Sequence, residues 1–291
     1  KYFKDLCKFN SVQVIDGAEF ELNDILKNGK TALVLMSQSG ETKDLHRCLE
    51  MCKDLDLITI GVVNVVDSLI AREVDCGCYL NAGREMGVAS TKSFTSQVII
   101  LSMMAIWFAQ VNDINLQKRK KHIRDLRKLY LDIEKTLEKN DIDSFLDIFK
   151  TQNNCFILGK DKSEAIAQEA ALKIKEISYI HAEGYSSSSL KHGPFALLEK
   201  DFPVILVAPE NKYFAKNMNA YEEIKSRYAK IILVTDKQDL DLPNTILVEK
   251  NECYGDLLCI VPLQLLALKL SLYKKCNVDM PRNLAKVVTV E

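Results

Sequence analysis

Residues 31–42 read TALVLMSQSGET, a continuous apolar run that passes directly into a polar loop at the start of a helical pattern. Similar apolar runs recur at 57–64 (LITIGVVN), 78–80 (CYL), 154–159 (NCFILG), 203–208 (PVILVA) and 230–236 (KIILVTD). Apolar strands that do not alternate with polar residues are typical of parallel sheets covered by helices on both faces. The sequence therefore predicts an α/β protein with two doubly wound parallel sheets.

The composition is that of an ordinary globular protein. The chain has 291 residues, 47% of them hydrophobic and 27% charged, which excludes collagen-like and wholly disordered chains. Its net charge of −1 gives no general attraction for nucleic acid or an anionic membrane. The nine cysteines are an odd number without a metal-type CxxC pair, so we expect reduced thiols, no metal site and a cytoplasmic location.

The chain organisation suggests two domains and a tail. Residues 115–140 are highly charged and free of Gly and Pro, which predicts a helix that bridges a first domain (1–140) and a second (141–276). After an apolar helix at 257–273, residues 277–291 are expected to form an extended tail. The opening residues KYFKDLCKFN resemble a helix end without a preceding strand, so we expect the first domain to be truncated at its N-terminus.

One segment tests the possibility of a membrane span. Residues 93–112 carry no charge, but only residues 98–109 are densely apolar. A spanning helix needs about 20 apolar residues. We therefore expect a buried helix here and no membrane partner.

The loop SQSGET (37–42) carries the sharpest chemical signal. Its hydroxyl groups and Gly40 lie at a helix N-terminus, where free N–H groups and the helix dipole favour an anion such as a phosphate monoester. The chain has no Walker lysine and no GxGxxG, which disfavours triphosphates and dinucleotides. An ordinary helix N-cap is the alternative interpretation.

The helical pattern at 165–177 carries the second signal. Lys173 lies about 55° and Glu176 about 115° from the centre of its apolar stripe, so both side chains can reach into a pocket from the rim of the core. A Glu with a raised pKa there is suited to act as a general base. A simple i,i+3 ion pair is the alternative.

Other candidates are weaker. His192, between a serine run and Gly-Pro, is placed in a loop or helix start where it can shuttle protons, whereas His46, His122 and His181 are expected to be structural. The cysteines of Cys76-Gly-Cys78 and of His46/Cys48/Cys52 are expected to be core thiols. The basic cluster at 118–128 is expected to be a solvated helix face rather than a nucleic-acid site.

Several motifs together resemble the isomerase half of the glutamine:fructose-6-phosphate aminotransferases, also called glucosamine-6-phosphate synthases. The resemblance runs almost from end to end. It is carried by SQSGET (37–42), NAGREMGVASTKSFTSQ (81–97), ALKIKEISYIHAEGY (171–185), LKHGP (190–194), VPLQLLAL (261–268) and DMPRNLAKVVTVE (279–291).

The resemblance implies a role for each matching residue. Phosphate binding falls to Ser37, Gln38, Ser39 and Thr42, and the sugar is lined by Val88, Ser90 and Ala285. Glu176 is implied to move a proton between C1 and C2, with Lys173 in support, and Lys286 to form a Schiff base with the ketose carbonyl. His192 is implied to assist ring opening in the site of the neighbouring subunit of a homodimer.

The family also implies two sugar-isomerase (SIS) domains, a tail that closes the sugar site, and no cofactor. The expected activity is conversion of fructose 6-phosphate to glucosamine 6-phosphate with ammonia from a glutaminase domain that this chain lacks. The alternative is a non-catalytic SIS module that senses a phosphosugar. The chain departs from the family at Ser188-Ser189, where Gly-Glu is usual, and at Asp161, where Gly is usual.

Overall fold

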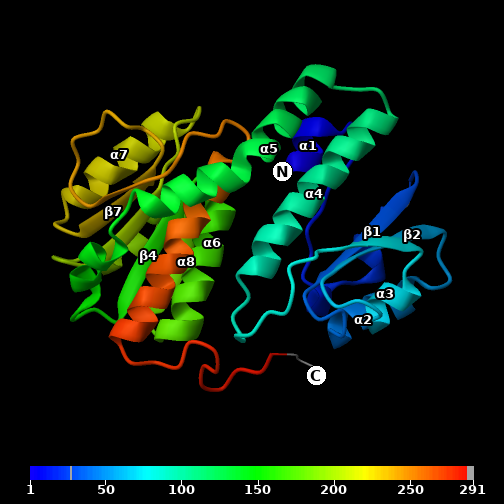
Figure 1. Ribbon diagram of the computed structural model, residues 1–291, viewed down its shortest axis with the longest axis horizontal. Helices are drawn as coiled ribbons and strands as arrows, with labels where there is room; N and C mark the ends of the chain where they lie inside the picture. Colours follow the sequence, from blue (N-terminus) through cyan, green and yellow to red (C-terminus); the bar gives the residue numbers. More distant parts are fainter. Residues whose placement is uncertain (27, 287–291) are drawn as a thin grey trace. The chain divides into compact units, whose positions relative to one another are not determined.

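The computed structural model describes residues 1–26 and 28–286, which form two compact units (Figure 1). One unit consists of residues 1–119 together with the tail from Arg282, and the other consists of residues 120–281. The domain limits expected from the sequence, after residues 140 and 276, stay a prediction.

The first unit is built on a three-stranded parallel sheet in the order β1-β2-β3. Its strands are β1 (Thr31–Ser37), β2 (Leu57–Val63) and β3 (Cys76–Tyr79). Helices α2 (Lys43–Cys52) and α3 (Leu69–Glu73) share one hydrophobic core with the strands (Figure 1). The buried residues of this core are Phe20, Leu35, Cys48, Leu49, Cys52, Val63 and Ile70.

Two further helices of this unit pack against each other, the short α1 (Tyr2–Leu6) and the long α4 (Lys92–Val111). Short 3₁₀ turns, η1 (Gly17–Glu19) and η2 (Leu22–Asp24), precede β1. The prediction that α4 is a buried helix is wrong for much of its surface: Met103, Trp107 and Val111 are exposed, Trp107 to 57%.

The second unit contains a five-stranded parallel sheet in the order β5-β4-β6-β7-β8. Its strands are β4 (Asn154–Gly159), β5 (His181–Ser186), β6 (Pro203–Val207), β7 (Lys230–Thr235) and β8 (Thr245–Leu247). Its helices are α6 (Lys162–Ser178), α7 (Phe214–Lys225) and α8 (Gly255–Tyr273), with 3₁₀ segments η3 (Ile142–Phe149), η4 (Ser189–His192) and η5 (Pro194–Leu197). The bridging helix α5 (Leu116–Glu138) precedes them, close to its expected limits.

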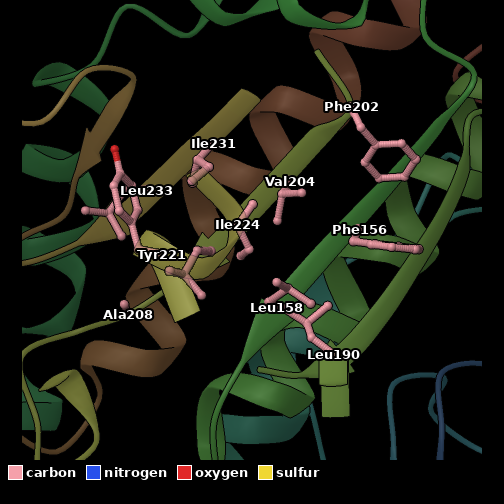
Figure 2. Close-up of a cluster of buried hydrophobic side chains, with 11 residues drawn as sticks. Phe156, Leu158, Leu190, Phe202, Val204, Ala208, Tyr221, Ile224, Ile231 and Leu233 are labelled. Atoms are coloured by element: carbon pink, nitrogen blue, oxygen red, sulfur yellow. The ribbon is translucent and has the colours of Figure 1, made fainter. Parts of the chain in front are cut away.

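Helices cover both faces of this second sheet. On one face α6 packs against α8 and against β4 and β5 (Figure 1). On the other face, alternate residues of β4, β6 and β7 meet Tyr221 and Ile224 of α7 in one buried cluster (Figure 2). Because both faces are buried, the strands read as continuous apolar runs. This confirms the α/β class and the two parallel sheets.

Two strands escaped prediction. Strand β5 reads HAEGYS, with polar residues along an edge position, and β8 has only three residues. An edge strand needs fewer apolar residues than a central one. Gly184 of β5 matters for the helix above it, because a Cβ there would lie 2.5 Å from Cα of Gln168 in α6. The glycine thus lets α6 approach the sheet.

Two described helices, α4 and α8, are long and apolar enough to cross a membrane by length and composition alone. Most of α8 is packed inside the second unit, while the corresponding stretch of α4 is only 28% buried. The tail from Cys276 to Lys286 contains no helix or strand, as expected, and residues 287–291 of the predicted tail lie outside the described residues.

Candidate functional site

The loop between β1 and α2 gathers hydroxyl groups at a helix N-terminus, as the sequence predicts. Ser37 is buried, and its Oγ lies 2.8 Å from Oγ1 of Thr42 and 3.4 Å from Oγ of Ser39. The backbone N–H of Gly40 donates to Ser37 Oγ at 2.9 Å, and that of Glu41 donates to Ser39 Oγ at 3.2 Å. Three hydroxyls are therefore gathered next to the first turn of a ten-residue helix, an arrangement chemically suited to an anion.

Gly40 gives this loop its shape. Its φ of +68° is in the left-handed region, and a Cβ there would lie 2.0 Å from Oγ of Ser68. The Gly40 carbonyl accepts from Ile70 N at 3.0 Å, and the Glu41 carboxylate accepts from Leu69 N at 2.9 Å. Two backbone N–H groups at the start of α3 therefore hydrogen-bond the loop, which restricts the conformations of its hydroxyl-bearing residues.

The tail brings Lys286 to the GVAS loop, almost 200 residues away in sequence. Lys286 Nζ donates to Gly87 O at 2.6 Å and lies 3.5 Å from Val88 O and 3.4 Å from Ser90 Oγ. Ala285 precedes it and is exposed. The structure thus brings together Val88, Ser90 and Lys286, three of the predicted site residues in the first unit.

In the second unit, α6 presents two carboxylates to one buried ammonium. Lys173 is only 4% exposed, and its Nζ lies 2.7 Å from Glu176 Oε2 and 3.6 Å from Glu169 Oε1. Burial raises the pKa of Glu169 to about 7, with Lys173 opposing the shift and Glu176 adding to it. The pair that the helical period placed at the rim is therefore part of a cluster of three charged side chains, in which Lys173 is buried and the two glutamates are partly buried.

His192 ends η4 and is exposed, and no residue in the described part of the chain hydrogen-bonds its ring. The other histidines have protein partners. His46 lies 3.0 Å from Glu73, His122 Nδ1 lies 3.3 Å from Tyr254 Oη, and His181 lies 3.4 Å from Glu183. An exposed imidazole can exchange protons with a bound molecule, whereas the partnered ones fit the expected structural role.

The corresponding loop of the second unit, between β6 and α7, is built differently. Asn211 Oδ1 accepts from Tyr213 N at 2.8 Å, which closes a local turn just before α7. The N–H of Glu210 donates to the buried Asp236 carboxylate at 2.5 Å, and the Glu210 carboxylate pairs with Lys237 and Lys250. Two carboxylates at this position disfavour an anion, so the second loop is less suited to a phosphate than the loop of the first unit.

All nine cysteines are free thiols, and no cluster of three or more His, Cys, Asp or Glu side chains suited to a metal occurs among the described residues. Cys48 and Cys52 lie in the core as expected. The same prediction is wrong for Cys76 and Cys78, which are exposed because β3 is an edge strand. The basic cluster at 118–128 is also less solvated than expected, since Arg119, His122 and Asp125 are buried.

Two acidic residues beside the predicted site residues were not singled out from the sequence. Glu169 lies on the same flank of α6 as Glu176, and its Oε1 lies 3.6 Å from Lys173 Nζ. Glu85 is 8% exposed and accepts from the backbone N–H of Thr91 and Ser93 at the start of α4. Its spacing to Thr91 and Ser93 just before a long helix is the signal that could have revealed it.

Asp161 explains one departure from the expected family pattern. It precedes α6 with φ +62° and ψ −111°, a conformation that glycine adopts with less strain. Asp161 thus has a positive φ at the position where the family pattern has glycine.

Comparison with known proteins gives a consistent result. The SIS domain family matches residues 5–107 and 148–248. The chain is 50% identical over 296 residues to the probable glutamine–fructose-6-phosphate aminotransferase (isomerizing) of Acanthamoeba polyphaga mimivirus, covering 100% of this chain and 48% of that protein. It is 42% identical to the human glutamine–fructose-6-phosphate aminotransferase (isomerizing) 2, covering 88% of this chain and 38% of that protein.

Among solved structures, the C-terminal domain of glucosamine-fructose-6-phosphate aminotransferase from Francisella tularensis matches with a TM-score of 0.81 and 33% identity. The match covers 86% of this chain and 73% of that one. The chain spans about half or less of the length of the curated relatives it matches.

Proposed function

Since this chain belongs to the SIS domain family and, within it, to the isomerizing glutamine–fructose-6-phosphate aminotransferases, we propose that it binds fructose 6-phosphate and carries the isomerase chemistry that yields glucosamine 6-phosphate. The main support is the meeting of distant motifs in one unit, where Lys286 of the tail lies against Val88 and Ser90 of the GVAS loop.

Phosphate binding is the first step of the proposed mechanism. The hydroxyls of Ser37, Ser39 and Thr42 donate to the phosphate oxygens, and the first N–H groups of α2 add a positive dipole end. Gln38, which is half-buried in the same loop, contributes its amide. The phosphate anchors the sugar so that its carbonyl end is presented to the reacting groups.

Proton transfer is the second step. An aldose–ketose isomerisation passes through an enediol, so one carboxylate must lie near both C1 and C2. Glu176 is proposed for this role, and its Oε2 lies 2.7 Å from Lys173 Nζ, an ion pair that orients the carboxylate. Glu169 shares the same ammonium, and its pKa of about 7 makes it a proton reservoir near neutral pH.

Covalent attachment is proposed for Lys286. Its neutral amine adds to the ketose carbonyl and forms an imine with loss of water. Val88, Ser90 and Ala285 then line the sugar. His192 is proposed to assist ring opening in the site of a second subunit, which its exposure and free ring nitrogens permit. This requires a homodimer.

The proposal also covers the source of ammonia, the need for a cofactor, the domain limits and the location of the protein. Ammonia comes from a glutaminase domain of the same parent protein, and the residues named above perform the chemistry without a metal or organic cofactor. The first SIS domain spans 1–140 and the second 141–276, with 277–291 closing the sugar site. Nine free thiols support a cytoplasmic location.

A sugar-phosphate isomerase assay tests the proposal. The 291-residue chain is given fructose 6-phosphate, and glucose 6-phosphate is measured for the wild type, Glu176→Gln and Lys286→Arg. We expect at least a 100-fold loss of turnover in Glu176→Gln and a clear loss in Lys286→Arg. Unchanged turnover in both variants would remove the assigned roles.

A further inference from the structure

Cys76 and Cys78 are the two exposed cysteines of this protein. The other seven are buried or partly buried, and all nine fall within the residues that the structure describes. A cysteine reacts as its thiolate, at an accessible sulfur. Burial raises the pKa of Cys155 and of Cys253 to about 12, so these two thiols stay protonated at neutral pH. Thiol reagents are therefore directed to strand β3.

The two exposed cysteines share one face of β3. Side chains two residues apart in a strand point to the same side of the sheet. Cys76 lies opposite Ile60 of β2 and Cys78 lies opposite Val62, at one edge of the three-stranded sheet. The edge strand therefore presents two thiols side by side.

Packing against β2 explains the glycine between the two cysteines. Gly77 lies opposite Gly61, and a Cβ on Gly77 would lie 2.4 Å from the Gly61 carbonyl oxygen. A larger residue fits only if the strand moves. Gly77 is thus accounted for by the close approach of two strands, and a need for a flexible Cys-Gly-Cys ring is not required to explain it.

Both ends of β3 are fixed to β2. Before the strand, Asp75 Oδ2 accepts from Thr59 N at 2.8 Å and from Thr59 Oγ1 at 2.7 Å, and Asp75 N donates to the same hydroxyl at 3.0 Å. After the strand, Leu80 N donates to Val63 O at 2.9 Å. These contacts hold the segment between them in an extended conformation.

An extended strand keeps the two sulfurs from joining directly. Each residue of a strand rises about 3.3 Å, so the Cβ atoms of Cys76 and Cys78 lie about 6.6 Å apart. A disulfide needs Cβ atoms about 3.5–4.5 Å apart. Closing a Cys76–Cys78 disulfide therefore requires β3 to bend away from β2. A bond from either sulfur to an external molecule requires no such change.

We propose that Cys76 and Cys78 are a thiol modification site that forms mixed disulfides with glutathione disulfide, while the extended strand holds back closure of a Cys76–Cys78 disulfide. This inference is independent of the proposed sugar chemistry. In the step concerned, the thiolate of one cysteine attacks a sulfur of glutathione disulfide, the S–S bond of the reagent breaks, and one glutathione leaves as a thiolate that takes up a proton. The cysteine sulfur is oxidised and the leaving sulfur is reduced.

The test is a product analysis of the folded chain. The 291-residue protein is incubated with excess glutathione disulfide at neutral pH and quenched in acid, and the peptide that carries both cysteines is examined by mass spectrometry. We expect glutathionyl groups on Cys76 and Cys78, with at least about tenfold more mixed disulfide than internal disulfide. In urea, where the strand is lost, the share of internal disulfide is expected to rise.

Two threonine variants test the restraint by the strand. Thr59→Val removes the hydroxyl that hydrogen-bonds Asp75 and keeps the shape of the side chain, so the share of internal disulfide is expected to rise. Thr151→Val changes an exposed threonine of the second unit and should leave the ratio of products as in the wild type. An unchanged ratio both in Thr59→Val and in urea would overturn the proposal.

Two cysteine variants give a test that does not depend on the fold of Thr59→Val. Cys76→Ser and Cys78→Ser each keep one thiol and should each collect about half of the wild-type mixed disulfide. A stable adduct in both single variants but not in the wild type would mean that the second thiol displaces glutathione, which overturns the proposal. A folded wild type that carries no glutathionyl group on either cysteine also overturns it.

Discussion

The variant Glu169→Gln tests whether burial of the Glu169 carboxyl, in the charged cluster of Glu169, Lys173 and Glu176 on α6, lowers the free energy of unfolding at neutral pH. The wild-type carboxyl has a pKa of about 7 against an unfolded value near 4.5, so the folded protein holds a proton that the unfolded chain has released in this interval. Stability contributed by the protonated form is present below about pH 4.5 and is lost as pH rises toward 7. Glutamine has the same shape and never ionises.

The size of the effect follows from the pKa difference. One unit of pKa corresponds to roughly 1.4 kcal/mol, so the interval from 4.5 to about 7 amounts to at most about 3 kcal/mol. Glu169 is 12% exposed, so little of this is screened by solvent. We expect the free energy of unfolding of Glu169→Gln, relative to wild type, to rise by about 1–3 kcal/mol between pH 5 and pH 8.

The assay is urea unfolding followed by circular dichroism at both pH values. Glu222→Gln, which removes a carboxylate that is 64% exposed on α7, is the matched control and should show no comparable change with pH. A difference between Glu169→Gln and wild type that stays constant from pH 5 to pH 8 would refute the reasoning, because it would mean that burial does not perturb this carboxyl.

Two further variants test the loop and the core. Gly40→Ala places a Cβ at φ +68° and only 2.0 Å from Ser68 Oγ. It should therefore lower the free energy of unfolding by about 2–3 kcal/mol and weaken fructose 6-phosphate binding, measured by calorimetry. Gly83→Ala, at φ +67° with open space around it, should cost only about 1 kcal/mol and leave binding intact, and equal effects of the two would contradict the clash. Leu206→Ala, in the fully buried cluster of the second sheet, should lower stability by about 2–5 kcal/mol in thermal unfolding, whereas the exposed Leu197→Ala should change it by less than about 0.5 kcal/mol. A small loss at Leu206 would contradict the packing of that face.

Much of the fold follows from local sequence. The apolar runs predict β1, β4, β6 and β7 to within one residue. For β4, β6 and β7 the reason is that a strand buried on both faces has no polar positions to obscure it. Strand β5 was missed for the converse reason: at the sheet edge its polar residues remain solvated. Helix α4 was predicted as buried from its apolar composition, yet only 28% of it is buried. Composition alone does not determine how much of a helix surface is covered by other elements.

The site was less predictable, because its decisive contacts are long-range. The loop SQSGET could be predicted because the strand before it, its hydroxyl groups and the helix after it are consecutive in the sequence. The contact between Lys286 and Gly87 joins residues 199 positions apart, and no periodicity carries that information. Lys173 was placed at the rim of the apolar stripe, but its side chain is buried. The resemblance to a family, rather than the helical period, singled out Lys286.

The most direct test of the central claim is proton exchange at the sugar carbons. The chain is incubated with fructose 6-phosphate in deuterated water, and deuterium at C1 and C2 is followed by NMR while calorimetry measures binding. We predict deuterium incorporation that depends on Glu176 and is lost in Glu176→Gln. Binding of fructose 6-phosphate without exchange at either carbon would contradict the account and indicate a phosphosugar sensor instead.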